Sequence, residues 1–152
     1  MKIAIGSDHA GFALKEDVRD LVKESGHEVI DCGTYNTESV DYPDFGEKVS
    51  RMVSGGEVDR GILVCGTGLG MTMVANKFPN VRAALCNDLF CARMSRLHND
   101  ANVLVLGGRI IGKDLAAEIV RTWLSTAFEG DRHMRRLHKI KKIEEDLNNN
   151  GY

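Results

Sequence analysis

The sequence lacks a long hydrophobic run, an excess of charge of one sign and a CxxC pair. Its 20 Lys and Arg residues nearly balance 22 Asp and Glu residues, which leaves a formal net charge of −2. This balance gives no electrostatic basis for binding nucleic acid or a membrane surface. No apolar segment is long enough to cross a bilayer, and the N-terminus has no signal-peptide pattern. These absences predict a cytoplasmic protein with neither kind of partner.

The cysteines and histidines show no metal-binding or redox pattern. The spacing of the four cysteines fits neither a zinc site nor a redox motif. No two of the five histidines stand four residues apart, the spacing at which a helix presents two ligands to one metal ion. We therefore expect free thiols, as in a reducing compartment, and no bound metal. The cysteines are Cys32, Cys65, Cys86 and Cys91.

A linker, a low-complexity segment and an internal repeat are also absent. The 152 residues are 43% hydrophobic and 28% charged, which is ordinary for a globular protein and sufficient for a sizeable core. We expect residues 1–152 to form a single domain.

Short apolar segments alternate along the chain with segments whose apolar residues recur at helical spacing. The expected strands cover residues 3–5, 29–30, 62–64, 83–85 and 103–106. A last helix with an apolar stripe is expected over 132–147, with fraying from Asn148 onward. The alternation predicts an α/β fold with a parallel sheet covered by helices on both faces. Ligands of such sheets bind beyond the carboxyl ends of the strands.

The most informative segment covers residues 61–77. A buried strand is expected to end at Cys65, a glycine-rich turn follows, and residues favouring a helix begin at Met71. Glycines allow a tight turn in which several backbone N–H groups and a helix dipole point at one place. That place suits a negative charge, either a phosphate or an oxyanion formed during a reaction. The glycines are Gly66, Gly68 and Gly70.

Cys65 has two interpretations at this stage. A helix N-terminus favours the thiolate form of a neighbouring cysteine, which makes Cys65 a candidate base or nucleophile. Alternatively, Cys65 is a small buried residue that fills the end of a strand. Known motifs do not decide between them: the P-loop pattern GxxxxGK[ST] is absent, and a low-molecular-weight phosphatase would need Arg where Met71 stands. A dinucleotide site is disfavoured because the glycines follow the third strand.

Three other polar segments are candidate site components. The segments 7–9 and 98–100 each place a histidine beside an aspartate or asparagine, although both could simply be polar caps at helix ends. Arg132 and Arg136 stand four residues apart and share a helix face, so both guanidinium groups could bind one phosphate. A solvated basic face is the alternative, but Arg at a helix start opposes the helix dipole, which favours a ligand role.

Several segments together resemble the ribose/galactose isomerase family, in particular type B ribose-5-phosphate isomerases. They are GSDHAGF (6–12), DYPD (41–44), CGTGLGMTMVANK (65–77), SRLHNDANVL (95–104), GGR (107–109) and GDRHMRR (130–136). The resemblance implies a Rossmann-like, three-layer α/β/α sandwich with a five-stranded parallel sheet. It also implies a homodimer or homotetramer with sites between subunits, and neither a metal nor an organic cofactor.

The resemblance assigns catalytic roles to residues of the glycine-rich turn and of segment 98–100. Cys65 would be the base that moves a proton between carbons 1 and 2 of the sugar. Thr67 would assist proton transfer to oxygen, and His98 would open the sugar ring. The turn backbone would form the anion hole for the enediolate, through Gly66, Gly68, Leu69 and Gly70. One branch of the family uses a glutamate base where this chain has Met71, so only the cysteine route is available here.

The remaining implied roles concern substrate binding. The resemblance implies sugar hydroxyl contacts for Asp8, Tyr42 and Asn99. It places the phosphate on His9, Arg132 and Arg136, joined by Arg109 from the partner subunit. The residues alone would have placed the phosphate on the glycine-rich turn.

The expected function is the interconversion of ribose 5-phosphate and ribulose 5-phosphate in the pentose phosphate pathway. An allose-6-phosphate or galactose-6-phosphate isomerase is the alternative within the family. A non-catalytic sugar-phosphate binding module is the alternative from another class, and it would not need Cys65. The helix at 132–147 is expected to pack on a partner subunit, since the sandwich is complete before it begins.

Overall fold

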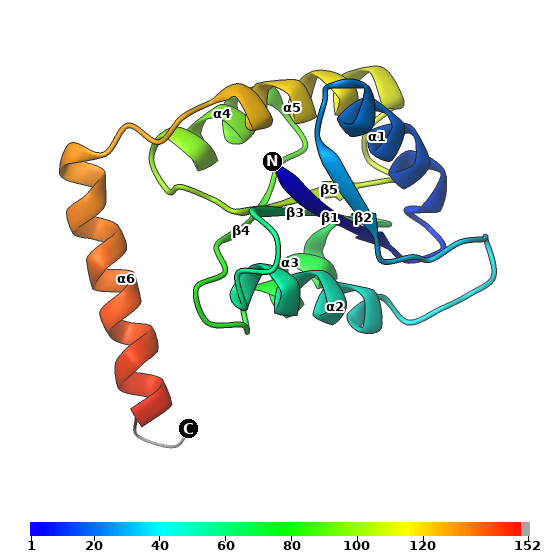
Figure 1. The fold of residues 1–152 in the computed structure, drawn as a ribbon. Helices are drawn as coiled ribbons and strands as arrows, with labels where there is room; N and C mark the ends of the chain where they lie inside the picture. Colours follow the sequence, from blue (N-terminus) through cyan, green and yellow to red (C-terminus); the bar gives the residue numbers. More distant parts are fainter. Residues whose placement is uncertain (150–152) are drawn as a thin grey trace.

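The structure is a computed structural model that describes residues 1–149 (Figure 1). Its sheet has five parallel strands in the order β2-β1-β3-β5-β4. The strands are β1 (Lys2–Ser7), β2 (Glu28–Asp31), β3 (Arg60–Cys65), β4 (Ala83–Leu85) and β5 (Val103–Gly107). All five coincide with the expected strands to within two residues at each end. The inner strands β1, β3 and β5 are buried, whereas β2 and β4 at the two sides of the sheet are only partly buried.

Helices cover both faces of the sheet, as the sequence predicts. One core lies between the sheet and α1 (Phe12–Glu24), α4 (Leu89–Leu97) and α5 (Lys113–Ser125). The other lies between the sheet and α2 (Tyr42–Ser54) and α3 (Leu69–Ala75). Successive strand residues alternate between the two cores, as the two-residue period of a strand requires. The α/β/α sandwich is therefore confirmed.

The strand order places a topological switch point between β1 and β3. From β1 the chain crosses through α1 to β2, whereas from β3 it crosses through α3 toward β4 on the other side of the sheet. Because α1 and α3 lie on opposite faces, the carboxyl ends of β1 and β3 leave a crevice between them. The strand register pairs Ser7 with Val64 and Cys65 with Gly107, so Cys65 lies at the carboxyl ends of the strands, beside this crevice.

Helix α3 begins earlier than the sequence suggests. Gly68 is its N-cap with a φ of 82°, so the helix starts at Leu69 rather than at Met71, and Gly70 belongs to its first turn. The expected start was wrong because residue preferences favour helix only from Met71, whereas the left-handed cap at Gly68 sets the actual first turn.

The last helix, α6 (Asp131–Asn149), extends away from the three layers (Figure 1). It includes Asn148 and Asn149, where fraying was expected; residues 150–152 lie outside the described residues. The Asn80 N–H donates to the Glu144 carboxylate at 3.0 Å and links the helix to the body. The apolar stripe of α6 is about half exposed in the single chain. Among residues 1–149, no helix combines the length and apolar character needed to cross a membrane.

Candidate active site

Cys65 ends the central strand β3 and lies against the first turn of α3. Its thiol is almost completely buried, with 4% of the residue exposed. The Gly68 N–H donates to Sγ at 3.2 Å, and the Cys65 carbonyl accepts the Gly108 N–H at 2.7 Å. The sulfur therefore accepts a hydrogen bond from the backbone at the start of a helix, where the positive end of the helix dipole lies. This contact favours the chemical interpretation of Cys65 over the packing interpretation.

The glycines of the turn serve different purposes. At Gly68, a Cβ atom would collide with Leu85, and the positive φ would itself be strained. At Gly70, a Cβ atom would lie 2.6 Å from the ring of Tyr42, so this glycine lets the tyrosine lie against the helix start. At Gly66, the nearest atoms would be 3.6 Å away. Packing therefore requires glycine at Gly68 and Gly70 but permits a methyl group at Gly66.

The turn also holds Thr67 and Leu69, which the resemblance places at the substrate through the Thr67 hydroxyl and the Leu69 backbone. Thr67 is exposed, and its Oγ1 accepts the Leu69 N–H at 3.3 Å. Leu69 itself is 54% exposed, so its side chain contributes nothing to the core. The hydroxyl of Thr67 therefore lies at the open side of the turn, where a ligand can reach it.

Asp8 and His9 follow β1 and face the same edge of the sheet. The Asp8 carboxylate accepts the Gly11 N–H at 2.9 Å, so it caps the loop before α1. Nδ1 of His9 lies 3.2 Å from the Val40 N–H and 3.3 Å from the Val40 carbonyl. This double contact fixes the ring whether Nδ1 accepts or donates, and it leaves Nε2 for a ligand.

Arg109 lies beside the glycine-rich turn of its own chain. Its backbone N–H donates to the Gly66 carbonyl at 2.9 Å, and its side chain passes next to Gly66. Arg109 thus belongs to the same group of candidate residues as Cys65 within one chain. The loop after β5 turns back over Cys65, which places Arg109 there directly.

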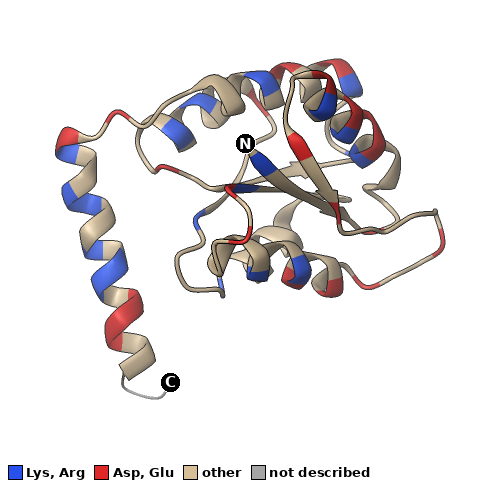
Figure 2. Cartoon of the chain, in the orientation of Figure 1, with Lys and Arg blue, Asp and Glu red and all other residues tan. Residues whose placement is uncertain are grey.

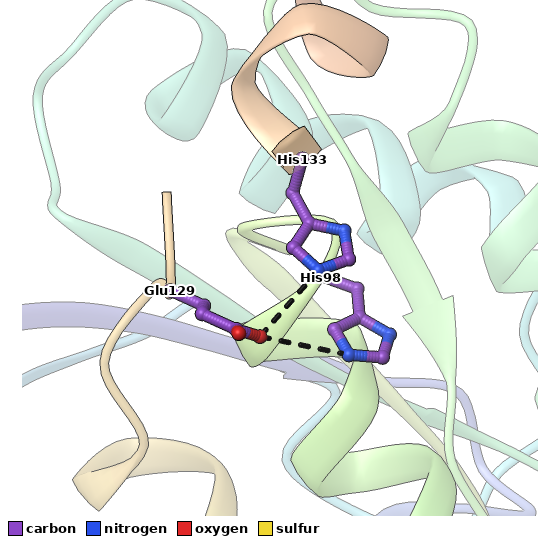
Figure 3. Close-up of side chains that lie close together, drawn as sticks. All are labelled: His98, Glu129 and His133. Atoms are coloured by element: carbon purple, nitrogen blue, oxygen red, sulfur yellow. Dashed lines mark ion pairs between the residues drawn. The ribbon is translucent and has the colours of Figure 1, made fainter. Parts of the chain in front are cut away.

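A second group of candidate residues lies at the C-terminal end of α4 and the start of α6 (Figure 3). His98 caps α4, and its ring stacks on that of His133 with centroids 4.2 Å apart. Oε2 of Glu129 lies 3.8 Å from Nε2 of His98 and 3.4 Å from Nε2 of His133. Arg132 and Arg136 flank His133, each with a nitrogen 3.4 Å from a ring nitrogen. Both arginine side chains thus lie beside the His133 ring, as their spacing predicts.

Within one chain, the two groups lie at opposite ends of the strands: one at the carboxyl ends and the other at the amino ends. His98 and the exposed Asn99 precede β5, whereas Cys65 pairs with Gly107 at its other end. A strand rises about 3.3 Å per residue, so the length of β5 alone separates them by roughly 13 Å. One chain therefore does not bring His98, Asn99, Arg132 and Arg136 to its own Cys65.

The cluster of His98, Glu129 and His133 has ligand-type atoms within 4.8 Å of one another but is poorly suited to a metal ion. The two rings are nearly parallel, at 12°, so their lone pairs do not converge on one point. Arg132 and Arg136 add positive charge, and Figure 2 shows further Lys and Arg residues along α6. This environment favours an anion over a divalent cation.

Comparison with known proteins agrees with this geometry. The family model described as Ribose/Galactose Isomerase matches residues 3–140. The chain belongs to the ribose/galactose isomerase family.

Individual members of the ribose/galactose isomerase family match over nearly the whole chain. Ribose-5-phosphate isomerase B of Escherichia coli is 48% identical, with 97% of this chain and 99% of the relative covered. A structure of ribose-5-phosphate isomerase B from Clostridium thermocellum has a TM-score of 0.95 and 57% identity over 97% of this chain and 99% of that one. The Mycoplasma genitalium enzyme with bound ribulose-5-phosphate has a TM-score of 0.91 and 40% identity, covering 95% and 96%.

Sequence reasoning about this family member missed three contacts. The backbone of Val40 against His9 could not be found, since any residue supplies an N–H and a carbonyl. Glu129 and His133 could not be found either, because Glu129 precedes α6 and is placed by its backbone bond to the distant Leu97.

Proposed function

We propose that this chain is an aldose–ketose isomerase that interconverts ribose 5-phosphate and ribulose 5-phosphate. The observation that carries the proposal is the buried Cys65 thiol, held by a backbone N–H at the start of α3. Such a thiol is a suitable base for a weakly acidic C–H group. Full-length similarity to ribose-5-phosphate isomerases B, one of them with bound ribulose-5-phosphate, supports this substrate class.

In the proposed mechanism, the Cys65 thiolate takes the proton from carbon 2 of the open-chain aldose. The electron pair of that C–H bond forms the carbon 1–carbon 2 double bond, and the carbonyl electrons move to oxygen 1. Backbone N–H groups between Gly66 and Gly70 stabilise the resulting enediolate. Thr67 assists the transfer of a proton between the two oxygens, and Cys65 returns its proton to carbon 1. The sum is an isomerisation that consumes no co-reactant.

We infer that each complete site needs two copies of the chain. The group around His98 lies about one strand length from Cys65 of the same chain, whereas an open five-carbon sugar is much shorter than a five-residue strand. A partner's His98, Asn99, Arg132 and Arg136 would complete the site, together with Asp8, His9, Tyr42 and Arg109 of the first chain. A dimer accounts for the distance between the Cys65 group and the His98 group of one chain, and it brings the two groups together in one site.

The exposed stripe of α6 supports the same assembly. Met134, Ile140, Ile143 and Leu147 are 41–60% exposed, which leaves an apolar helix face without a partner in the single chain. A groove of about 790 Å³ lies between this helix and the β4 side of the sandwich. We propose that a second copy covers this face and thereby brings the two groups together.

A coupled assay with ribose 5-phosphate, allose 6-phosphate and galactose 6-phosphate tests the activity and its preferred chain length. Turnover of ribose 5-phosphate well above the two hexose phosphates is expected. Cys65→Ala should abolish turnover while substrate still binds, because the base acts only in the chemical step. A variant that keeps turnover within about tenfold of the parent would exclude the cysteine base. If neither protein turns over any sugar phosphate but both bind one, the chain is a binding module.

A further inference from the structure

Glu129 is fixed in place by the backbone around it. Its N–H donates to the Leu97 carbonyl at 3.0 Å, at the residue before His98. The His133 N–H donates to the Gly130 carbonyl at 2.9 Å, which ties the start of α6 to the same segment. The carboxylate thus faces both imidazoles from a defined position, although Glu129 is 48% exposed (Figure 3).

Charged groups surround the two stacked imidazole rings, and their effect on the pKa of His133 is known. His133 is buried, and its pKa is lowered by desolvation and then by the charge of His98, with Arg132 and Arg136 adding to the effect. Glu129 opposes this shift. The lowered pKa favours a neutral His133 ring, which stacks on the His98 ring with the centroids 4.2 Å apart. Among the described residues, Nδ1 of His98 has no hydrogen-bond partner.

We propose that Glu129 is a positioning residue for ring opening: its carboxylate holds the Nε2–H of His98 and leaves Nδ1 free to exchange a proton with the sugar. This inference rests on the proposed isomerase function. The present distance of 3.8 Å between Oε2 and Nε2 is too long for a hydrogen bond. Catalytic hydrogen bonds are often long without substrate and shorten when the site fills.

The ring-opening step balances without a co-reactant. Nδ1 of His98 takes the proton from the hydroxyl on carbon 1 of cyclic ribose 5-phosphate. The electron pair of that O–H bond becomes the second carbon–oxygen bond of the aldehyde. The bond from carbon 1 to the ring oxygen breaks with its electron pair on that oxygen, which receives the proton back from His98. Glu129 stabilises the imidazolium between the two transfers.

The test separates ring opening from the isomerisation chemistry. Ribulose 5-phosphate cannot close a five-membered ring, because its terminal oxygen carries the phosphate. Exchange of its carbon 1 hydrogen with deuterium from D₂O therefore needs Cys65 but not ring opening. Glu129→Gln should lower kcat/KM for ribose 5-phosphate at least about tenfold, while this exchange stays within about twofold of the parent. Glu129→Asp should recover part of the loss.

Glu144→Gln is the matched control, since Glu144 also contacts the body from α6 but lies away from His98. It should change neither rate. Equal loss of turnover and exchange in Glu129→Gln would show a merely structural role, and an unchanged turnover would show no role; either result overturns the proposal. If the unmodified protein exchanges no deuterium, the isomerase function itself is wrong. The two failures are thus distinguishable.

Discussion

Gly66 is a glycine of the turn that packing does not require, in contrast to Gly68. Its neighbour Gly68 is required by the backbone, because φ is 82° and a Cβ would collide with Leu85. Gly66 has no such constraint, since its Cβ would meet the nearest atoms, on Ala10 and Arg109, at the ordinary contact distance of 3.6 Å. A glycine that packing does not require, next to the proposed base, leaves space for the reacting oxygen.

We therefore predict opposite outcomes for two alanine substitutions in the turn. Gly68→Ala should lower the free energy of unfolding by about 1–3 kcal/mol, because it combines strained φ with overpacking. Gly66→Ala should change that free energy by less than about 0.5 kcal/mol but reduce kcat, since the methyl group would enter the proposed anion hole. Urea unfolding and the coupled assay measure the two effects. Equal stability losses would contradict the distinction.

At the residue scale, the sequence predicted part of the site. Cys65 and its glycines were found because a strand, a turn and a helix follow one another within a few residues. The position of Arg109 beside Gly66 was not predicted, because no local pattern shows where the loop after β5 turns. Glu129 was missed because its partners come together only through the backbone bond between Glu129 and Leu97.

At the element scale, α1 and β2 are joined by a buried lysine. Lys15 is 0% exposed, and its Nζ bonds both carboxylate oxygens of Asp31 at 2.9 Å. Glu16 also contacts Nζ at 3.0 Å. Burial tends to raise the pKa of Asp31, but the hydrogen bonds from Lys15 and the Gly33 N–H outweigh it, so the pKa lies below its ordinary value. The pair holds the start of the loop that reaches His9.

This pair predicts an acid-sensitive contribution to stability. A carboxyl with a lowered folded pKa stabilises the fold above its unfolded pKa, and the contribution is lost as the pH falls through the folded value. Asp31→Asn should cost about 3 kcal/mol at neutral pH, since it leaves the Lys15 charge buried with Glu16 as its remaining partner. The difference from the parent should shrink below about pH 4. Urea unfolding across that pH range measures it; a constant difference would contradict the assignment.

The helix face of α6 gives a second prediction at this scale. Arg136→Ala should weaken ribose 5-phosphate binding by roughly 30-fold or more, since losing one partner of a desolvated charge pair costs on the order of 2–5 kcal/mol. Inhibition by inorganic phosphate should weaken in parallel. Arg135, which makes no contact with His133, is the matched control. An Arg135→Ala effect as large as that of Arg136→Ala would exclude Arg136 as a phosphate ligand.

At the scale of the whole molecule, the sequence predicted the three layers but not the distance between Cys65 and His98 within one chain. Alternating apolar and amphipathic segments were sufficient for the α/β/α architecture. The position of His98 was also available in principle. Residues that follow a strand lie at the carboxyl edge of a parallel sheet, whereas residues that follow a helix, such as His98 and Asn99, lie at the opposite edge. The strand order itself depends on long-range pairing that local patterns do not contain.

The separation predicts that two inactive variants complement each other. On the proposed assembly, Cys65→Ala and His98→Asn each remove one half of every site in a homodimer. In a mixed dimer, one site receives Cys65 from one chain and His98 from the other, whereas the second site lacks both. Unfolding and refolding an equal mixture should therefore restore about a quarter of the parent activity, half of the dimers having one intact site of two. Mixing without restored activity would show that each chain forms its own site.

The placement of His98 and Cys65 at opposite edges also has a genetic consequence. On the proposed assembly, a defect at one edge is expressed in the active centre of the neighbouring chain. A cell that makes a normal and a Cys65-deficient version in equal amounts would keep about half of its sites, as if the alleles were independent. Loss of the α6 apolar face, by contrast, would weaken both centres of a mixed pair, because both depend on the same interface.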